Sequence, residues 1–290
     1  MNQQQLIDST VEEERLHQNK EHEKFWYRWG PYLSERSWAT VREDYSFNGD
    51  AWSNFPFEHA NARVFRWGED GIFGVSDNKQ LVCMNVALWN GKDERLKERM
   101  FGLTGPQGNH GEDCKEMYYY LDNLPSHAYM KALYKYPFKK PYPYKELVEE
   151  NAKRGYEDLE YEIYDIDGVF KDSKTGDSPY YDVVFEMAKN DDNPDDLNFR
   201  ITVHNRSKID SGELHIMPQI FFRNTWDFEA TNKCVKPHLD RDAKETNLIH
   251  VNHPKFGPTQ ILFQPSPGGF GETAEDADDI DPHLLFTENE

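Results

Sequence analysis

Residues Tyr180 to Phe222, YYDVVFEMAKNDDNPDDLNFRITVHNRSKIDSGELHIMPQIFF, have the clearest strand pattern in the sequence. Three runs in this stretch, at residues 180–188, 198–205 and 213–222, alternate between apolar and polar residues or are continuously apolar. The segments DDNPDD and SKIDSG between the runs have turn composition. Alternation with period two places successive side chains on opposite faces of a strand. The stretch therefore predicts an antiparallel meander.

Other segments predict further strands and short helices around this meander. Runs rich in apolar or aromatic residues favour strands, and we expect them at residues 80–89, 115–121, 247–251 and 259–263. Helices are expected at residues 10–27, 94–101 and 144–154, with the Pro/Tyr/Lys-rich stretch 134–144 as a separator. Ser9 and Glu12 have the spacing of a capping box at the start of the first helix. The acidic blocks 191–196 and 275–281 are expected to be solvated turns.

These elements predict a mainly β protein, a large antiparallel β-sandwich with an N-terminal helix and short decorating helices. We divide the chain into a helical segment at 1–28, a sandwich domain at 29–264 and a tail at 265–290. The tail is a Pro/Gly-rich acidic loop followed by the apolar run Leu284-Leu285-Phe286, which we interpret as the start of an interrupted strand.

Charge and composition exclude several classes of function. The 290 residues include 53 acidic and 33 basic side chains, a net charge of −20, which argues against nucleic acid and anionic membranes as partners. No apolar window reaches the ~18–20 residues of a membrane-spanning helix, and the polar N-terminus does not resemble a secretory signal. The three isolated cysteines favour a reducing compartment. We therefore expect a cytoplasmic protein with no membrane association.

Aromatic and charged side chains alternate in irregular segments of the first third of the chain. Aromatic rings that lie against sugar faces, next to planar groups that bind hydroxyls, are what a carbohydrate site requires. The alternative is that the tryptophans fill the core and the Arg–Glu pairs hold long loops together. The candidate residues of this kind are Trp29, Arg36, Trp38, Arg42, Glu43, Asp44, Arg66, Trp67, Glu69 and Asp70.

Standard catalytic and metal-binding motifs are absent from the sequence. It contains no P-loop, HExxH motif or GxSxG elbow. His110, Glu112 and Asp113 could bind a cation, but an isolated histidine near acidic residues is more often a hydrogen-bonding node in a loop. We expect no metal and no cofactor. Carboxylates are so abundant that sequence spacing identifies no catalytic pair.

Several longer segments resemble one fungal and bacterial branch of glycoside hydrolase family 63, the family of processing alpha-glucosidase I and the mannosylglycerate hydrolases. The longest is WGPYLSERSWATVREDYS at residues 29–46, where the branch often has glycine in place of Ala39. The others are RWGEDGI at 66–72, LWNGKD at 88–93, GNHGED at 108–113, KYP at 135–137 and FRNTW at 222–226. The similarity covers about residues 20–230 and weakens in the second half.

The resemblance implies an N-terminal β-sandwich followed by a large (α/α)6 barrel that contains the acid and base of an inverting reaction. No such barrel fits in these 290 residues, so the family's catalytic residues have no counterparts in them. We thus interpret the chain as the inactive N-terminal portion of a glycosidase for alpha-linked gluco- or manno-oligosaccharides. The loops that bear the candidate residues would then face the missing barrel, as pocket rim or domain interface, or else hold the sandwich together internally. The resemblance adds a further loop to this set, residues 109–113, with His110, Glu112 and Asp113 as candidates.

Two alternatives remain open at this point. One is a stand-alone carbohydrate-binding β-sandwich with a complete sugar site in its tryptophan-bearing loops. The other is a scaffold domain that docks another protein through these loops. Sugar binding by the isolated chain would separate the first from the second.

Overall fold

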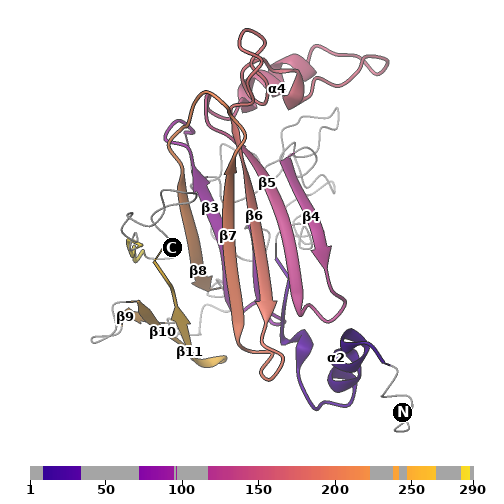
Figure 1. Cartoon of the computed structure of the whole chain (residues 1–290), viewed down its shortest axis with the longest axis vertical. Helices are drawn as coiled ribbons and strands as arrows, with labels where there is room; N and C mark the ends of the chain where they lie inside the picture. The colour runs from indigo at the N-terminus through magenta and orange to yellow at the C-terminus, as the bar shows by residue number, and fades with distance from the viewer. Residues whose placement is uncertain are drawn as a thin grey trace, which may run out of the picture. The chain divides into compact units, whose positions relative to one another are not determined.

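The computed structural model describes residues 9–33, 72–94, 96, 117–222, 238–241, 247–265 and 282–287. The chain divides into two compact units, Met1–Arg223 and Asn224–Glu290. Unit 1 contains two four-stranded antiparallel sheets (Figure 1), in the orders β1-β2-β3-β8 and β4-β5-β6-β7. The mainly β, sandwich-like prediction is confirmed, whereas our division at residues 28 and 264 stays a prediction.

The strands of unit 1 are short to medium in length and pair in chain order within each sheet, except for β8. The first sheet consists of β1 (Trp29–Gly30), β2 (Ile72–Asp77), β3 (Val82–Trp89) and β8 (His215–Phe222). The second consists of β4 (Tyr118–Asn123), β5 (Tyr129–Pro137), β6 (Tyr180–Lys189) and β7 (Leu197–Asn205). Residues 180–222 thus form β6, β7 and β8. Because β8 pairs with β3 in the other sheet, these three strands do not form the predicted meander.

Alternation with period two builds the core of the second sheet. In β6, Val183, Phe185 and Met187 are fully buried on one face, because every second side chain points the same way. The Phe185 ring stacks on Phe73 of β2 with centroids 5.5 Å apart. The Phe73 amide, at a β-bulge where φ is 52°, donates to the Tyr118 hydroxyl at 2.7 Å. These contacts join the two sheets.

Strand β5 was missed by the prediction of a separator at 134–144. Its sequence YMKALYKYP alternates, so Met130, Ala132, Tyr134 and Tyr136 are fully buried while the residues between them are partly exposed. Here tyrosine acts as a core residue, since burial of a large ring outweighs the turn signal of the following prolines. Helix α4 (Tyr144–Asn151) then begins at the predicted position.

Helix α2 (Val11–Lys20) is shorter than predicted and is capped one residue later. Thr10 Oγ1 accepts from the Glu13 amide at 3.2 Å, and the Glu13 carboxylate accepts from the Thr10 amide at 2.8 Å. The Ser9–Glu12 capping box is therefore wrong, because Glu12 instead accepts from the Ser126 amide at 2.7 Å. The helix stops before His22, whose φ is 60°, and the chain continues into the 3-10 turn η1 (Trp26–Arg28).

Replacing Thr10 by alanine is expected to weaken α2 by about 1 kcal/mol, because the Glu13 amide loses its acceptor. Hydrogen exchange of the α2 amides should accelerate about fivefold. Ser9→Ala is the matched control, since it leaves the observed cap intact. Equal acceleration by the two variants would contradict this assignment of the cap.

Unit 2 contains a three-stranded antiparallel sheet, β11-β10-β9, formed by β9 (His238–Arg241), β10 (Leu248–His253) and β11 (Gly257–Leu262). Val251 of β10 is its buried centre. Residues 284–286 have irregular backbone in the structure, and their interpretation as the start of an interrupted strand stays a prediction. The predicted helix at 94–101 lies almost entirely outside the described residues.

Candidate functional site

Of the predicted site residues, Trp29 is the one that lies in the described part of the chain. It is in β1 with 3% of its surface exposed, so it packs in the interior. Outside the described residues lie Arg36, Trp38, Arg42, Glu43, Asp44, Arg66, Trp67, Glu69, Asp70, His110, Glu112 and Asp113. Their role at a pocket rim or domain interface stays a prediction. The polar clusters that the structure does describe are elsewhere in unit 1.

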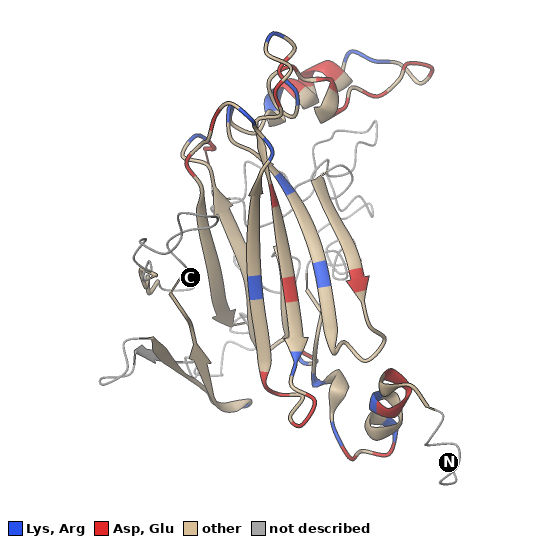
Figure 2. Ribbon diagram, viewed as in Figure 1, with Lys and Arg blue, Asp and Glu red and all other residues tan. Residues whose placement is uncertain are grey.

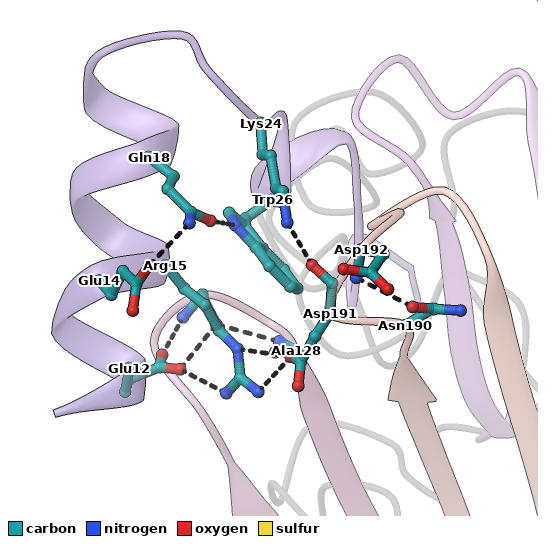
Figure 3. Close-up of polar contacts among 11 residues, drawn as sticks. Glu12, Glu14, Arg15, Gln18, Lys24, Trp26, Ala128, Asn190, Asp191 and Asp192 are labelled. Atoms are coloured by element: carbon teal, nitrogen blue, oxygen red, sulfur yellow. Dashed lines mark hydrogen bonds and ion pairs between the residues drawn. The ribbon is translucent and has the colours of Figure 1, made fainter.

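The first cluster fixes residues 9–33, which we call the N-terminal strap, to the turns at one end of the second sheet (Figure 3). Arg15 donates to Asp191 Oδ1 at 2.6 Å and to Glu12 Oε2 at 3.2 Å. The Arg15 guanidinium also lies over the Trp26 ring, 5.3 Å from its centroid. Trp26 Nε1 donates to Gln18 Oε1 at 3.0 Å, so this ring joins η1 to α2.

The β4–β5 turn and the β6–β7 turn of the second sheet both take part in this attachment. Glu12 accepts from the Ser126 hydroxyl at 2.9 Å in the β4–β5 turn. In the β6–β7 turn, Asp195 pairs with Arg28, and the Asp191 carbonyl accepts from Lys24. The acidic block 191–196, expected to be a solvated turn, therefore also binds the cations of the strap. Basic residues that alternate with acidic ones along 12–28 are the signal from which this attachment could have been predicted.

Lys189 at the end of β6 is the buried part of this cluster. It is in phase with Phe185 and Met187, so its side chain points inward. Its ammonium donates to the Trp26 carbonyl at 2.6 Å and to the Trp29 carbonyl at 2.7 Å. Burial lowers the pKa of Lys189 to about 8, against the opposing pull of nearby carboxylates. Because the buried ammonium donates hydrogen bonds to two backbone carbonyls, it is suited to anchoring the strap and not to attacking a substrate.

The second cluster is LWNGKD, residues 88–93, one of the segments that carry the family resemblance. Asn90 Nδ2 donates to the Pro137 carbonyl at 2.9 Å, and Asn90 Oδ1 accepts from the Lys92 and Asp93 amides. Lys92 Nζ donates to the Phe138 carbonyl at 2.7 Å. These bonds run from the end of β3 to the end of β5. The motif therefore joins the two sheets.

Asp93 completes this joint. It accepts from the hydroxyl of Tyr136 and from the amide of Tyr142, the latter at 2.6 Å. Burial and the adjacent charge of Asp93 raise the pKa of Tyr136 far above its usual range, so Tyr136 remains a neutral donor. The Trp89 indole donates to the Asp93 carbonyl at 3.0 Å. The resemblance of this motif to a glycosidase branch implies no such structural role.

A third group of charges forms a row across the outer face of the second sheet. The register aligns Asp122 of β4, Lys131 of β5, Glu186 of β6 and Arg200 of β7. Figure 2 shows the row as alternating red and blue bands on the four strands. Glu186 accepts from the Tyr129 hydroxyl at 2.7 Å and from Arg200 at 2.7 and 2.9 Å. Opposite charges on neighbouring strands favour this register over a one-residue slip.

Replacing Glu186 by glutamine is expected to destabilise unit 1 by about 1 kcal/mol at pH 7. The Tyr129 hydrogen bond, followed by the Arg200 contact, lowers the pKa of Glu186 below its ordinary 4.5. A lowered carboxylate pKa stabilises the fold above the unfolded-state value, and this contribution disappears as the pH falls through the folded-state value. The difference between the two proteins should therefore shrink below pH 4.5, as measured by urea unfolding at pH 7 and pH 3.5.

Arg200→Gln is the control for this prediction, because most of the Arg200 side chain is exposed and its charge is screened by water. It should cost less than Glu186→Gln. A loss from Glu186→Gln that is the same at both pH values would contradict the assigned role of the carboxylate.

Neither a metal centre nor a membrane span is found in the described residues. Over those residues, no group of three or more His, Cys, Asp or Glu side chains is arranged to hold a metal ion. No helix among them is long and apolar enough to cross a membrane.

Comparison with known proteins finds one curated relative to report. The chain is 74% identical over 291 residues to uncharacterized protein YMR196W of Saccharomyces cerevisiae. The similarity covers 98% of this chain but 27% of the yeast protein, so the chain spans about a quarter of the length of this relative. No protein-family model matches the chain, and no solved structure matches it.

Proposed function

We propose that this chain is the N-terminal, non-catalytic domain of a glycosidase similar to glycoside hydrolase family 63. The complete protein would hydrolyse alpha-linked gluco- or manno-oligosaccharides with inversion of the anomeric centre. The observation that carries the proposal is the ordered series of segments over residues 20–230 that resemble one branch of this family, headed by WGPYLSERSWATVREDYS. Runs of this length are far more specific than a short motif.

Two further observations support the proposal. The sandwich-like pair of sheets in unit 1 has the architecture that the resemblance implies for the N-terminal domain. The yeast relative, at 74% identity, is long enough to contain several hundred further residues, which an (α/α)6 barrel requires.

The chemistry of inversion explains why the domain would be inactive alone. An inverting glycosidase needs a general acid and a general base about 6.5–9.5 Å apart, with a water molecule between the base and the sugar. In the proposed protein both carboxylates belong to the barrel, and the reaction needs no cofactor. The contribution of this domain is to support the barrel and to border its sugar pocket with loops such as the one bearing Arg36 and Trp38.

The experiment compares the full-length protein with the 290-residue chain on a panel of alpha-linked gluco- and manno-disaccharides and mannosylglycerate. Proton NMR follows the anomer that is released first. We expect the full-length protein to release the inverted anomer from at least one substrate and the 290-residue chain to release no sugar. Retention of configuration, no turnover by the full-length protein, or turnover by the 290-residue chain would each overturn the proposal.

A further inference from the structure

The loop that follows helix α4, residues 154–162, exposes two large apolar side chains to solvent. Tyr156 is 102% exposed and Leu159 is 86% exposed, the highest values among the large hydrophobic residues of the described part. Folded proteins tolerate single exposed apolar residues. Tyrosine is enriched among the residues that dominate the binding energy of protein interfaces. We therefore interpret the two exposed side chains, three residues apart in one loop, as a contact surface.

Hydrogen bonds hold this loop in one conformation. Arg154 donates to the Leu159 carbonyl at 2.6 Å, and Asp158 Oδ2 accepts from the Gly155 amide at 2.7 Å. At its base, the Asn151 side chain donates to the Tyr161 carbonyl at 2.8 Å and accepts from the Tyr161 amide at 2.7 Å. The exposed side chains are therefore presented by ordered backbone, so a partner would not have to order the loop on binding.

The charge around the loop indicates what the partner surface contains. Between residues 144 and 162 there are seven carboxylates and three basic side chains. Four of the carboxylates, those of Glu157, Asp158, Glu160 and Glu162, are in the loop itself. The same loop of a second copy is a poor partner, because both surfaces would carry the same excess of carboxylates. A complementary surface combines a small apolar pocket with a rim of lysine or arginine.

We propose that residues 154–162 are a docking loop for a different protein, which receives Tyr156 and Leu159 in an apolar pocket with a basic rim. The apolar pair supplies the buried centre of the contact, and the surrounding carboxylates give orientation and a fast, salt-dependent encounter. This binding function is separate from the proposed glycosidase activity and does not depend on it.

The test uses the full-length protein with a benzophenone amino acid, p-benzoylphenylalanine, as a photo-crosslinking probe in place of Tyr156. The same probe in place of Tyr120, an exposed residue of β4, is the control. After irradiation in cells, mass spectrometry identifies the crosslinked peptide. We expect an adduct specific to position 156, on another protein, at a site with apolar residues and lysine or arginine beside them.

Variants then test both parts of the contact with the captured protein in purified form. Tyr156→Ala and Leu159→Ala should each weaken binding at least tenfold with an unchanged melting temperature, since both side chains are exposed. Glu157→Lys should weaken it more at 50 mM than at 500 mM salt, whereas Asp192→Lys, in the β6–β7 turn, should not. Asp158 is left unchanged because it holds the loop.

Four outcomes would overturn the proposal. They are no adduct at position 156 above the Tyr120 control, an adduct within the same polypeptide, an adduct with a second copy, and binding unaffected by Tyr156→Ala and Leu159→Ala. None of these outcomes concerns sugar hydrolysis, so the result is independent of the glycosidase assay.

Discussion

Replacing Asp93 by alanine is expected to destabilise unit 1 by about 3 kcal/mol. The substitution leaves the fully buried hydroxyl of Tyr136 and the amide of Tyr142 without their acceptor. An unsatisfied buried donor costs about 1–3 kcal/mol, and the two losses occur at one joint between the sheets. Hydrogen exchange of the β3 and β5 amides reports on this unit alone and should accelerate about 100-fold.

Two further variants separate the hydrogen bonds of Asp93 from its charge and packing. Asp93→Asn keeps one acceptor oxygen at nearly the same volume and should cost about half as much. Tyr136→Phe removes one donor and should cost about 1 kcal/mol. In the double variant Asp93→Ala/Tyr136→Phe, the loss of stability should be smaller than the sum of the two single losses, because the two residues share one hydrogen bond. Additive losses would contradict a direct role for the Tyr136–Asp93 contact.

The parts of the fold that follow from side-chain alternation could be predicted from the sequence. Strands β6 and β7 have period two over eight or more residues, and their bounds agree with prediction to within one residue. Pairing between distant strands could not be predicted in this way. Strand β8 follows β7 in the chain but pairs with β3, with Leu88 opposite Ile216 and Ala87 opposite Met217. The alternation within each strand carries no information on which strand is its neighbour.

Local signals failed where tertiary contacts outweighed them. Ser9 and Glu12 have capping-box spacing, but Glu12 gains two hydrogen bonds to Ser126 and so is not available as a cap. The buried position of Lys189 could have been inferred, since it continues the inward phase of Val183, Phe185 and Met187. Its two carbonyl partners could not, because Trp26 and Trp29 are about 160 residues away in the chain.

For the candidate site too, the residue types could be recognised in the sequence, but their arrangement in space could not be predicted from it. Aromatic and charged residues in the first third of the chain indicate a kind of surface but not its arrangement. LWNGKD is instructive because its resemblance to a glycosidase branch could suggest a sugar contact. In the structure its Asn90, Lys92 and Asp93 side chains are engaged by β5 and the residues after it. The motif therefore has a structural role in this chain, and its presence is no evidence of a chemical one.

Replacing Lys189 by methionine is expected to loosen the N-terminal strap by about 2 kcal/mol at pH 7. Methionine retains most of the buried stem but leaves the Trp26 and Trp29 carbonyls without their donor. Loss of the desolvated charge offsets part of this cost. Exchange of the α2 amides should accelerate about 30-fold. Val11→Ala, at an exposed position of α2, is the control and should change this exchange far less.

The pH dependence of strap stability gives the sharper test, because its sign follows from the direction of the pKa shift. Burial lowers the pKa of Lys189 to about 8 from 10.5, so between these values the open strap binds more protons than the closed one. The closed strap of the wild type should therefore gain stability as the pH rises from 8 to 10, by about tenfold in its opening equilibrium per pH unit. Lys189→Met has no such group and should show none of this gain. Parallel pH profiles for the two proteins would contradict a lowered pKa of Lys189 in the closed strap.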